Sequence, residues 1–389
     1  MTPAFAFATA TEILFGRGQL AQAPARVAAL GRQVLLVQGG SPARAAPLAQ
    51  ALAAAGCTVT RFAVAQEPDV ALIEAGLAAA RAAGADVVVA LGGGAVIDAG
   101  KAIAALVPAP RPMFAHLEVV GQGLPLDAAP LPFIAIPTTA GTGAEVTRNA
   151  VIAAPDPAQP AQLRKVSLRD ARMLPRLAIV DPALTDHCPR AITLASGLDA
   201  ITQVIEPFTS TRANPLTDAL CRDAIPRGLA ALIRLMQAED PQARDEMAWV
   251  SLCGGIALAN AGLGAVHGLA GPLGGLTGAA HGAICGALLP HVLRANRAAI
   301  TTPDLAARLD QVGHWIGAAF GQPGADVPQA AALLATWSAS AGLPGLAAQG
   351  ITPAAQAAAA EAAASSSSMK ANPAPLSVAT LQAILHSAA

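Results

Sequence analysis

Short apolar, β-branched runs alternate with alanine-rich stretches through the first half of the chain. Helices are expected over 41–56 and 69–84. The runs that resemble buried strands are QVLLVQGG (33–40), CTVTRFAV (57–64), ADVVVALGGG (85–94), LPFIAIPTT (131–139) and RLAIVDP (176–182). Because most of these runs are continuously apolar rather than alternating, the pattern predicts a parallel sheet with helices on both faces.

The pattern changes near residue 183, after which no convincing strand follows. The later segments show helical periodicity, and a low-complexity stretch over 357–373 precedes a last helix over 376–388. We therefore expect an α/β domain with a parallel sheet over 1–183 and an all-α domain over 184–389.

Composition excludes several classes of protein. The net charge is −1 and no basic block stands out, so nucleic acid is not an expected partner. The five cysteines are odd in number and scattered without a CxxC, which argues against a disulfide framework or a cysteine zinc site and fits a reducing cytoplasm. The N-terminal stretch lacks the pattern of a signal peptide.

An uncharged run from Met247 to Leu293 requires a membrane test. A spanning helix needs about 20 strongly apolar residues. Asn260, two histidines, Pro272 and many glycines interrupt this run. A pair of buried helices in a protein without a membrane span is the better interpretation.

Two loops at strand ends are candidates for nucleotide binding. VVVALGGGAVIDAGKAIAAL (87–106) predicts a strand, a triple-glycine turn and a helix, whose free N–H groups favour a phosphate. The spacing is neither GxGxxG nor a Walker loop. IPTTAGTGAEVT (136–147) adds hydroxyls that can bond ribose or phosphate oxygens. Two such loops in one sheet indicate a nucleotide-binding crevice.

Three polar side chains fall on one face of an apolar helix in the second half. Asp199 and Gln203 stand at i and i+4 in SGLDAITQVIEPF, and Glu206 lies near the same face. The apolar flanks predict that this helix is substantially buried. A buried carboxylate needs a metal, a base or several hydrogen-bond donors as a partner.

His267 and His281 lie in the uncharged run and are candidates to partner that carboxylate. Taken singly, each could be a packed core histidine. Pro272 and the surrounding glycines predict two helical pieces with a break at the proline, each offering one imidazole. Together with the buried Asp199, the two imidazoles favour a metal site.

Several motifs, in the same order, resemble those of the iron-containing (group III) alcohol dehydrogenase family. The resemblance runs from EILFGRGQL (12–20) to the last helix. The motifs are GGGAVIDAGKAIA (92–104), PTTAGTGAEVT (137–147), GLDAITQVIEPF (197–208), and GLGAVHGLAGPLGG (262–275) followed by AAHG (279–282) and LLPHVLRAN (288–296). In the first motif Ala95 stands where the family has serine.

The resemblance implies a Rossmann-like nucleotide domain followed by a helical domain, with the active site in the cleft between them. It also implies hydride transfer between NAD(P)(H) and a small alcohol and its aldehyde or ketone, often with Fe²⁺, in a homodimer or larger homo-oligomer.

Carried over by position, the resemblance implies that Asp199, His267 and His281 are catalytic and ligate the metal, with Gln203 at the place of a fourth ligand, normally histidine. It also implies a cofactor-binding set of Gly39, Ser41, Gly93, Gly94, Ala95, Asp98, Thr138, Thr139, Thr142, Asn149 and Lys165. Lys101 is a further candidate for a phosphate or ribose contact.

Two departures from the family pattern affect the chemistry. Gln203 is a neutral amide where the family has imidazole, although an Asp/Gln/His/His set still suits Fe²⁺, Zn²⁺ or Mn²⁺. Gly271 stands where the family often has another histidine, so a water chain or a ribose hydroxyl would carry the proton.

Cofactor preference depends on the end of the first Rossmann strand. NAD-preferring members of the family often have Asp at the position of Gly39. The stretch VQGGS (37–41) has no carboxylate, and Ser41 can bond a phosphate. NADP(H) is therefore expected to be tolerated or preferred.

Three alternatives stay open. The first is a maleylacetate-reductase-like enzyme that reduces an oxo-acid with weak or no metal dependence. The second is a dehydroquinate-synthase-like lyase, against which the fuller match to the dehydrogenase motifs argues. The third is a nucleotide-binding homologue without catalytic activity.

Overall fold

A computed structural model describes residues 4–157 and 159–389 of the chain, which folds into two compact units. The α/β unit comprises Thr9–Thr139 and Gly143–Thr185, and the helical unit comprises Met1–Ala8, Ala140–Thr142 and Asp186–Ala389. The sequence assigned residues 140–142 to the α/β part. They belong to the helical unit because Gly141 lies against Ser196, leaving 2.9 Å between a Cβ at this glycine and the serine Cβ.

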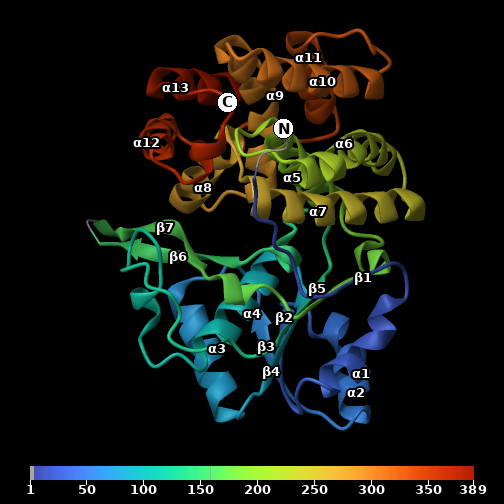
Figure 1. The fold of residues 1–389 in the computed structure, drawn as a ribbon, viewed down its shortest axis with the longest axis vertical. Coiled ribbons are helices and arrows are strands. Elements are labelled where there is room, and N and C mark those ends of the chain that lie inside the picture. Colours follow the sequence, from blue (N-terminus) through green and yellow to red (C-terminus); the bar gives the residue numbers. More distant parts are fainter. Residues whose placement is uncertain (1–3, 158) are drawn as a thin grey trace. The chain divides into compact units, whose positions relative to one another are not determined.

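The α/β unit contains a six-stranded sheet in the order β1-β8-β5-β4-β2-β3 (Figure 1). All of its neighbouring strands pair in parallel, which confirms the predicted parallel sheet. The strands are β1 (Ile13–Phe15), β2 (Gln33–Gly39), β3 (Thr58–Val64), β4 (Val87–Gly92), β5 (Phe133–Pro137) and β8 (Leu177–Val180).

Helices cover both faces of this sheet. On one side α1 (Ala23–Ala28) and α2 (Pro42–Ala54) share a core with Leu36 and Val89. On the other side α3 (Val70–Ala82) and α4 (Gly94–Leu106) share a core with Leu35. Successive strand residues thus enter opposite cores, which explains why the strands are apolar along their whole length.

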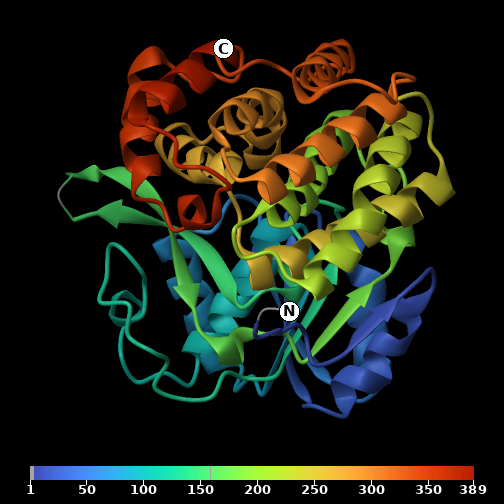
Figure 2. The same ribbon diagram turned by 45° about the horizontal axis from the view of Figure 1, so that its top comes forward.

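The sequence analysis missed an antiparallel hairpin formed by β6 (Asn149–Asp156) and β7 (Gln159–Arg169). It extends from the α/β unit as a two-stranded ribbon (Figure 2, green). Only alternate residues of β6 are buried, and the register shifts between Pro155 and Asp156. The prolines and the polar faces hid both strands, and β1 was missed because it has three residues.

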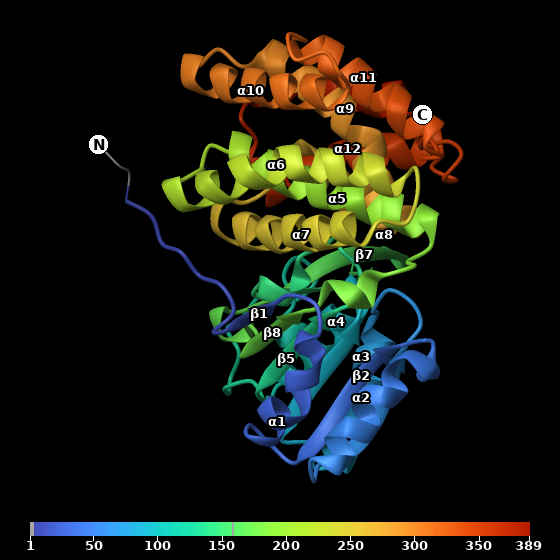
Figure 3. The same ribbon diagram turned by 90° about the vertical axis from the view of Figure 1, so that its right-hand side faces the viewer.

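The helical unit contains the remaining long helices, and the described residues after Val180 form no strand, as expected (Figure 3). The helices are α5 (Arg190–Thr209), α6 (Pro215–Leu235), α7 (Pro241–Ala261), α8 (Ala265–Thr277), α9 (His281–Ala299), α10 (Pro303–Ala319), α11 (Val327–Ser340), α12 (Pro353–Ala364) and α13 (Val378–Ser387). Helix α5 is central, and every residue from Gly197 to Thr209 is buried.

The break expected at Pro272 is wrong. Helix α8 continues through this proline, because the burial of Leu269 and Leu273 on either side outweighs one lost backbone hydrogen bond. The helix ends instead at Gly278, whose φ of 70° is left-handed and whose N–H bonds the carbonyl of Gly274. Two helical pieces do form, and His281 begins the second.

No single helix of the described chain has the length and apolarity needed to cross a bilayer. The pair α7 and α8 meets those criteria only when taken together, and the two are bent by 100° at their junction.

Candidate active site

Helix α5 presents Asp199, Gln203 and Glu206 on one buried face, as its apolar flanks predicted. Their exposed fractions are 2%, 3% and 5%. The spacing of four and seven residues stacks them along successive turns. Burying three polar side chains is unfavourable unless each finds a partner, so the surroundings of this face determine its chemistry.

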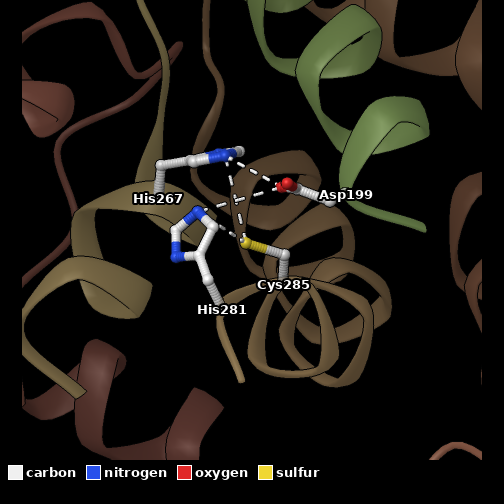
Figure 4. A group of neighbouring side chains, drawn as sticks. All are labelled: Asp199, His267, His281 and Cys285. Atoms are coloured by element: carbon white, nitrogen blue, oxygen red, sulfur yellow. Dashed lines mark hydrogen bonds and ion pairs between the residues drawn. The ribbon is translucent and has the colours of Figure 1, made fainter. Parts of the chain in front are cut away.

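Both predicted histidines reach this face (Figure 4). His267 Nε2 lies 3.3 Å from Asp199 Oδ1, and His281 Nε2 lies 3.9 Å from the same oxygen. Their ring centroids are 5.3 Å apart. Residues that are 68 and 82 positions after Asp199 in the sequence thus converge on one carboxylate oxygen.

Glu206 fixes the orientation of His267. Its Oε2 lies 2.6 Å from His267 Nδ1, and its Oε1 accepts a hydrogen bond of 2.7 Å from the Val266 N–H. A carboxylate only accepts hydrogen bonds, so the imidazole N–H is on Nδ1 and Nε2 faces Asp199. This is the carboxylate–histidine arrangement that orients metal-binding imidazoles in proteins.

Cys285 is a fourth member of the cluster, and the sequence analysis missed it. Its buried Sγ lies 3.7 Å from His281 Nε2 and 3.9 Å from His267 Nε2. One ligand atom from each of Asp199, His267, His281 and Cys285 lies within 4.8 Å of the others. The sequence did carry a signal, because Cys285 is four residues after His281 and therefore shares its helical face.

The cluster is suited to a divalent cation. With its proton on Nδ1, His267 turns a lone pair toward Asp199 Oδ1, and two acceptors 3.3 Å apart repel unless a positive charge lies between them. Asp199 Oδ1 and Gln203 Oε1 are two of the buried side-chain atoms that have no hydrogen-bond partner among the described residues. A cation bound among these atoms would give both buried oxygens an interaction partner.

The pKa values in the cluster reflect the same arrangement. Burial alone would lower the pKa of His267, but Cys285, Glu206 and Asp199 together hold it well above its usual range. Burial opposes ionisation of Asp199, yet both histidines hold the pKa of its carboxyl below the ordinary value. Burial raises the pKa of the Cys285 thiol to about 12. When no metal is bound, a proton on His267 supplies the positive charge between this imidazole and the Asp199 carboxylate.

Gly271, where the resemblance expects another imidazole, faces open space. A Cβ at this position would meet no atom within 4 Å. Among the described residues other than its chain neighbours, no side chain lies within 4 Å of that Cβ, so a Cβ can be accommodated at this position.

The two nucleotide loops meet at the carboxyl edge of the sheet. Thr138 N donates to Gly92 O at 2.9 Å, and a Cβ on Gly93 would lie 3.3 Å from Thr139 Oγ1. Gly93 precedes α4, so Gly94 and Ala95 supply the first N–H groups of that helix. Thr142 differs from these residues because it belongs to the helical unit.

The sheet order places these loops at a topological switch point. From β2 the chain runs to β3 on one side and then returns to β4 on the other. Ligands of open α/β sheets bind outside the carboxyl ends of the strands at such a point. Gly39 ends β2 with no atom within 4 Å of a Cβ, and Ser41 precedes α2 without using its hydroxyl as a cap.

Charged candidates near these loops already have protein partners. The ammonium of Lys101 donates to Ala144 O, Thr147 Oγ1 and Asn149 O at 2.7–2.9 Å. These bonds use all three of its donors, so the expected phosphate contact of Lys101 is wrong. Asp98 accepts from the Val151 N–H at 3.1 Å, and Lys165 lies 3.3 Å from Glu67.

Comparison with known proteins identifies the class. Residues 10–182 match the model of the iron-containing alcohol dehydrogenase family, and residues 193–389 match the C-terminal region of the same family. The chain therefore belongs to the iron-containing alcohol dehydrogenase family and is an oxidoreductase. This confirms the resemblance inferred from the motifs.

Individual relatives agree with this assignment. The chain is 36% identical to 4-hydroxybutyrate dehydrogenase of Cupriavidus necator over 68% of each protein. It is 38% identical to lactaldehyde reductase of Escherichia coli over 60% of this chain and 59% of that enzyme, which is less than two thirds of its length. The crystal structure of a 1,3-propanediol oxidoreductase superposes with a TM-score of 0.88 over 100% of both chains at 29% identity.

Proposed function

We propose that this enzyme transfers hydride between NAD(P)(H) and a small alcohol and its aldehyde or ketone, using a divalent metal held by Asp199, Gln203, His267 and His281. The observation that best supports this proposal is the buried Asp199 Oδ1, which lacks a hydrogen-bond partner while two imidazole nitrogens lie within 3.9 Å of it. Family membership favours Fe²⁺, and Zn²⁺ or Mn²⁺ also suit these donors.

When bound, the metal supplies Lewis-acid polarisation of a substrate oxygen, and the nicotinamide supplies or accepts the hydride. The protein's own residues prepare this chemistry. Asp199 contributes a buried negative charge, and Glu206 keeps the Nε2 lone pair of His267 directed at the cluster. Since Gly271 offers no titratable group, we propose that a water chain or a ribose hydroxyl of the cofactor carries the proton.

The α/β unit would bind the nucleotide. Gly93, Gly94 and Ala95 present the N-terminus of α4 to a phosphate, while Thr138 and Thr139 add hydroxyls from the adjacent strand. Asp98 remains predicted to orient the cofactor, and Thr142, Asn149 and Lys165 remain predicted cofactor-binding residues.

NADP(H) is the proposed preferred cofactor. At the end of β2, Gly39 leaves open space and offers no carboxylate that would repel a phosphate. The hydroxyl of Ser41 does not cap α2. The exposed Arg61 adds positive charge nearby, because its guanidinium donates to Gln38 Oε1 at 2.7 Å and to Pro42 O at 2.5 Å. A 2′-phosphate is a suitable partner for that charge.

We further expect the enzyme to be a cytoplasmic homodimer or larger homo-oligomer that acts on a free small molecule, with neither nucleic acid nor a membrane as partner.

The test is a substrate panel with matched metal removal. Purified protein should oxidise NADPH with short aldehydes or ketones, lose this activity on chelation and regain it with Fe²⁺ or Zn²⁺. Reduction of maleylacetate that is insensitive to chelation would favour the oxo-acid alternative. Cofactor binding without turnover of any aldehyde, ketone or oxo-acid would refute the proposed activity.

A further inference from the structure

Cys285 occupies a position that a packing role alone does not explain. It is fully buried on α9, one turn after His281, and its sulfur faces two imidazole nitrogens at 3.7 and 3.9 Å (Figure 4). A neutral thiol can donate its one weak hydrogen bond to only one of these nitrogens. The unpartnered Asp199 Oδ1 belongs to the same cluster.

The separations between donor atoms match those around a tetrahedral cation. For Zn²⁺ bond lengths, a nitrogen is about 3.4 Å from an oxygen and about 3.6 Å from a sulfur. The structure has nitrogen–oxygen separations of 3.3 and 3.9 Å and nitrogen–sulfur separations of 3.7 and 3.9 Å. Each of these four pairs is within about 0.5 Å of the ideal value, and all four ligand atoms lie within 4.8 Å of one another.

Gln203 has a different relation to the cluster. It lies one turn after Asp199 on the same buried face of α5, and it helps to lower the pKa of the Asp199 carboxyl. A side chain in this position can orient the carboxylate, as the groups behind metal ligands commonly do. A thiolate is also a stronger donor to Fe²⁺ or Zn²⁺ than a neutral amide oxygen.

We infer that Cys285 binds the metal as a thiolate and takes, in place of the Gln203 amide proposed above, the ligand position that the family's missing histidine leaves. This inference rests on the proposed metal-dependent function. The thiol proton passes to solvent as the metal binds. Because thiolate favours Zn²⁺ over harder cations such as Mn²⁺, Cys285 should also set the metal selectivity of the site.

Cobalt substitution tests the inference through a readout other than activity. The full-length protein, stripped of metal and loaded with Co²⁺, should show a near-ultraviolet thiolate-to-cobalt charge-transfer band. Cys285→Ser should abolish this band, weaken Zn²⁺ binding by more than about tenfold and reduce the selectivity for Zn²⁺ over Mn²⁺. Cys253→Ser is the matched control, since this buried thiol on α7 lies near Asp223 and Arg227 instead.

X-ray absorption of the Zn²⁺-loaded wild-type protein gives a second test that needs no variant. One sulfur at about 2.3 Å from zinc is expected. If the protein binds metal but shows neither a sulfur neighbour nor a charge-transfer band, Cys285 is not a ligand. The proposed metal-dependent function would be unaffected by that result. Protein that binds neither Co²⁺ nor Zn²⁺ would overturn both. Loss of the band in Cys253→Ser, with Cys285→Ser unaffected, would also contradict the inference.

Discussion

Replacing Glu206 with glutamine should weaken metal binding without unfolding the protein. The carboxylate accepts one hydrogen bond on each oxygen, from the Val266 N–H and from His267 Nδ1. A carboxamide has one acceptor oxygen, so one of these buried N–H groups must face an NH₂ group. An unpaired buried donor costs about 1–3 kcal/mol.

That energy should appear mainly in the metal affinity, because the His267 side chain can rotate whereas the Val266 N–H is held by the backbone of α8. Loss of such an orienting partner typically weakens metal binding by about 10–100-fold, equivalent to about 1.4–2.8 kcal/mol. This loss of binding free energy lies within the cost of about 1–3 kcal/mol for an unpaired buried donor.

The assay is a Zn²⁺ competition titration against a chromophoric chelator near neutral pH. Circular dichroism and the thermal midpoint would verify the fold, and Glu361→Gln on the exposed side of α12 would serve as the control. A Zn²⁺ dissociation constant within about twofold of wild type in folded Glu206→Gln would refute the orienting role.

Four further changes test other parts of the account. Gly39→Asp fits because no atom lies within 4 Å of a Cβ there, and it should lower the NADPH-to-NADH ratio of kcat/KM at least about tenfold; an unchanged ratio contradicts the assignment. Gly271→His should add an ionisation between about pH 5 and 8 to the kcat profile. Lys101→Met should lower the free energy of unfolding by about 2–4 kcal/mol in denaturant titrations, because it removes three hydrogen bonds of 2.7–2.9 Å to buried or partly buried acceptors. Burial raises the pKa of Glu145 to about 7, so the folded state keeps a proton that the unfolded chain releases, and stability falls as pH rises from about 4.5 to 7. Glu145→Gln should flatten that fall in the denaturation midpoint.

The sheet was predictable where both faces of a strand are buried. β4 and β5 are continuous buried apolar runs, and the polar residues of β2 are confined to Gln33 and Gln38 near its ends. The hairpin β6–β7 was not predictable by the same rule, because β6 alternates buried and partly exposed residues and prolines interrupt its end. Edge structures of this kind depend on tertiary contacts more than on composition.

The candidate site was predictable to the extent that helical spacing encodes it. Asp199 and Gln203 share a face by sequence alone, and the convergence of His267 and His281 followed from the family motifs. Cys285 was not predictable from a CxxC pair, because only the helical step of four residues from His281 places it beside that imidazole. The helix break was misplaced because Pro272 was given more weight than Gly278, whose left-handed conformation ends α8.

Metal analysis of the purified protein tests the central claim most directly. Wild-type protein should contain about one divalent metal ion per chain, as Asp199, His267, His281 and a fourth donor together form one site. Asp199→Ala and His267→Ala should each lose both the metal and NADPH-dependent carbonyl reduction while remaining folded. If both variants retain metal content and activity, the assigned site is wrong.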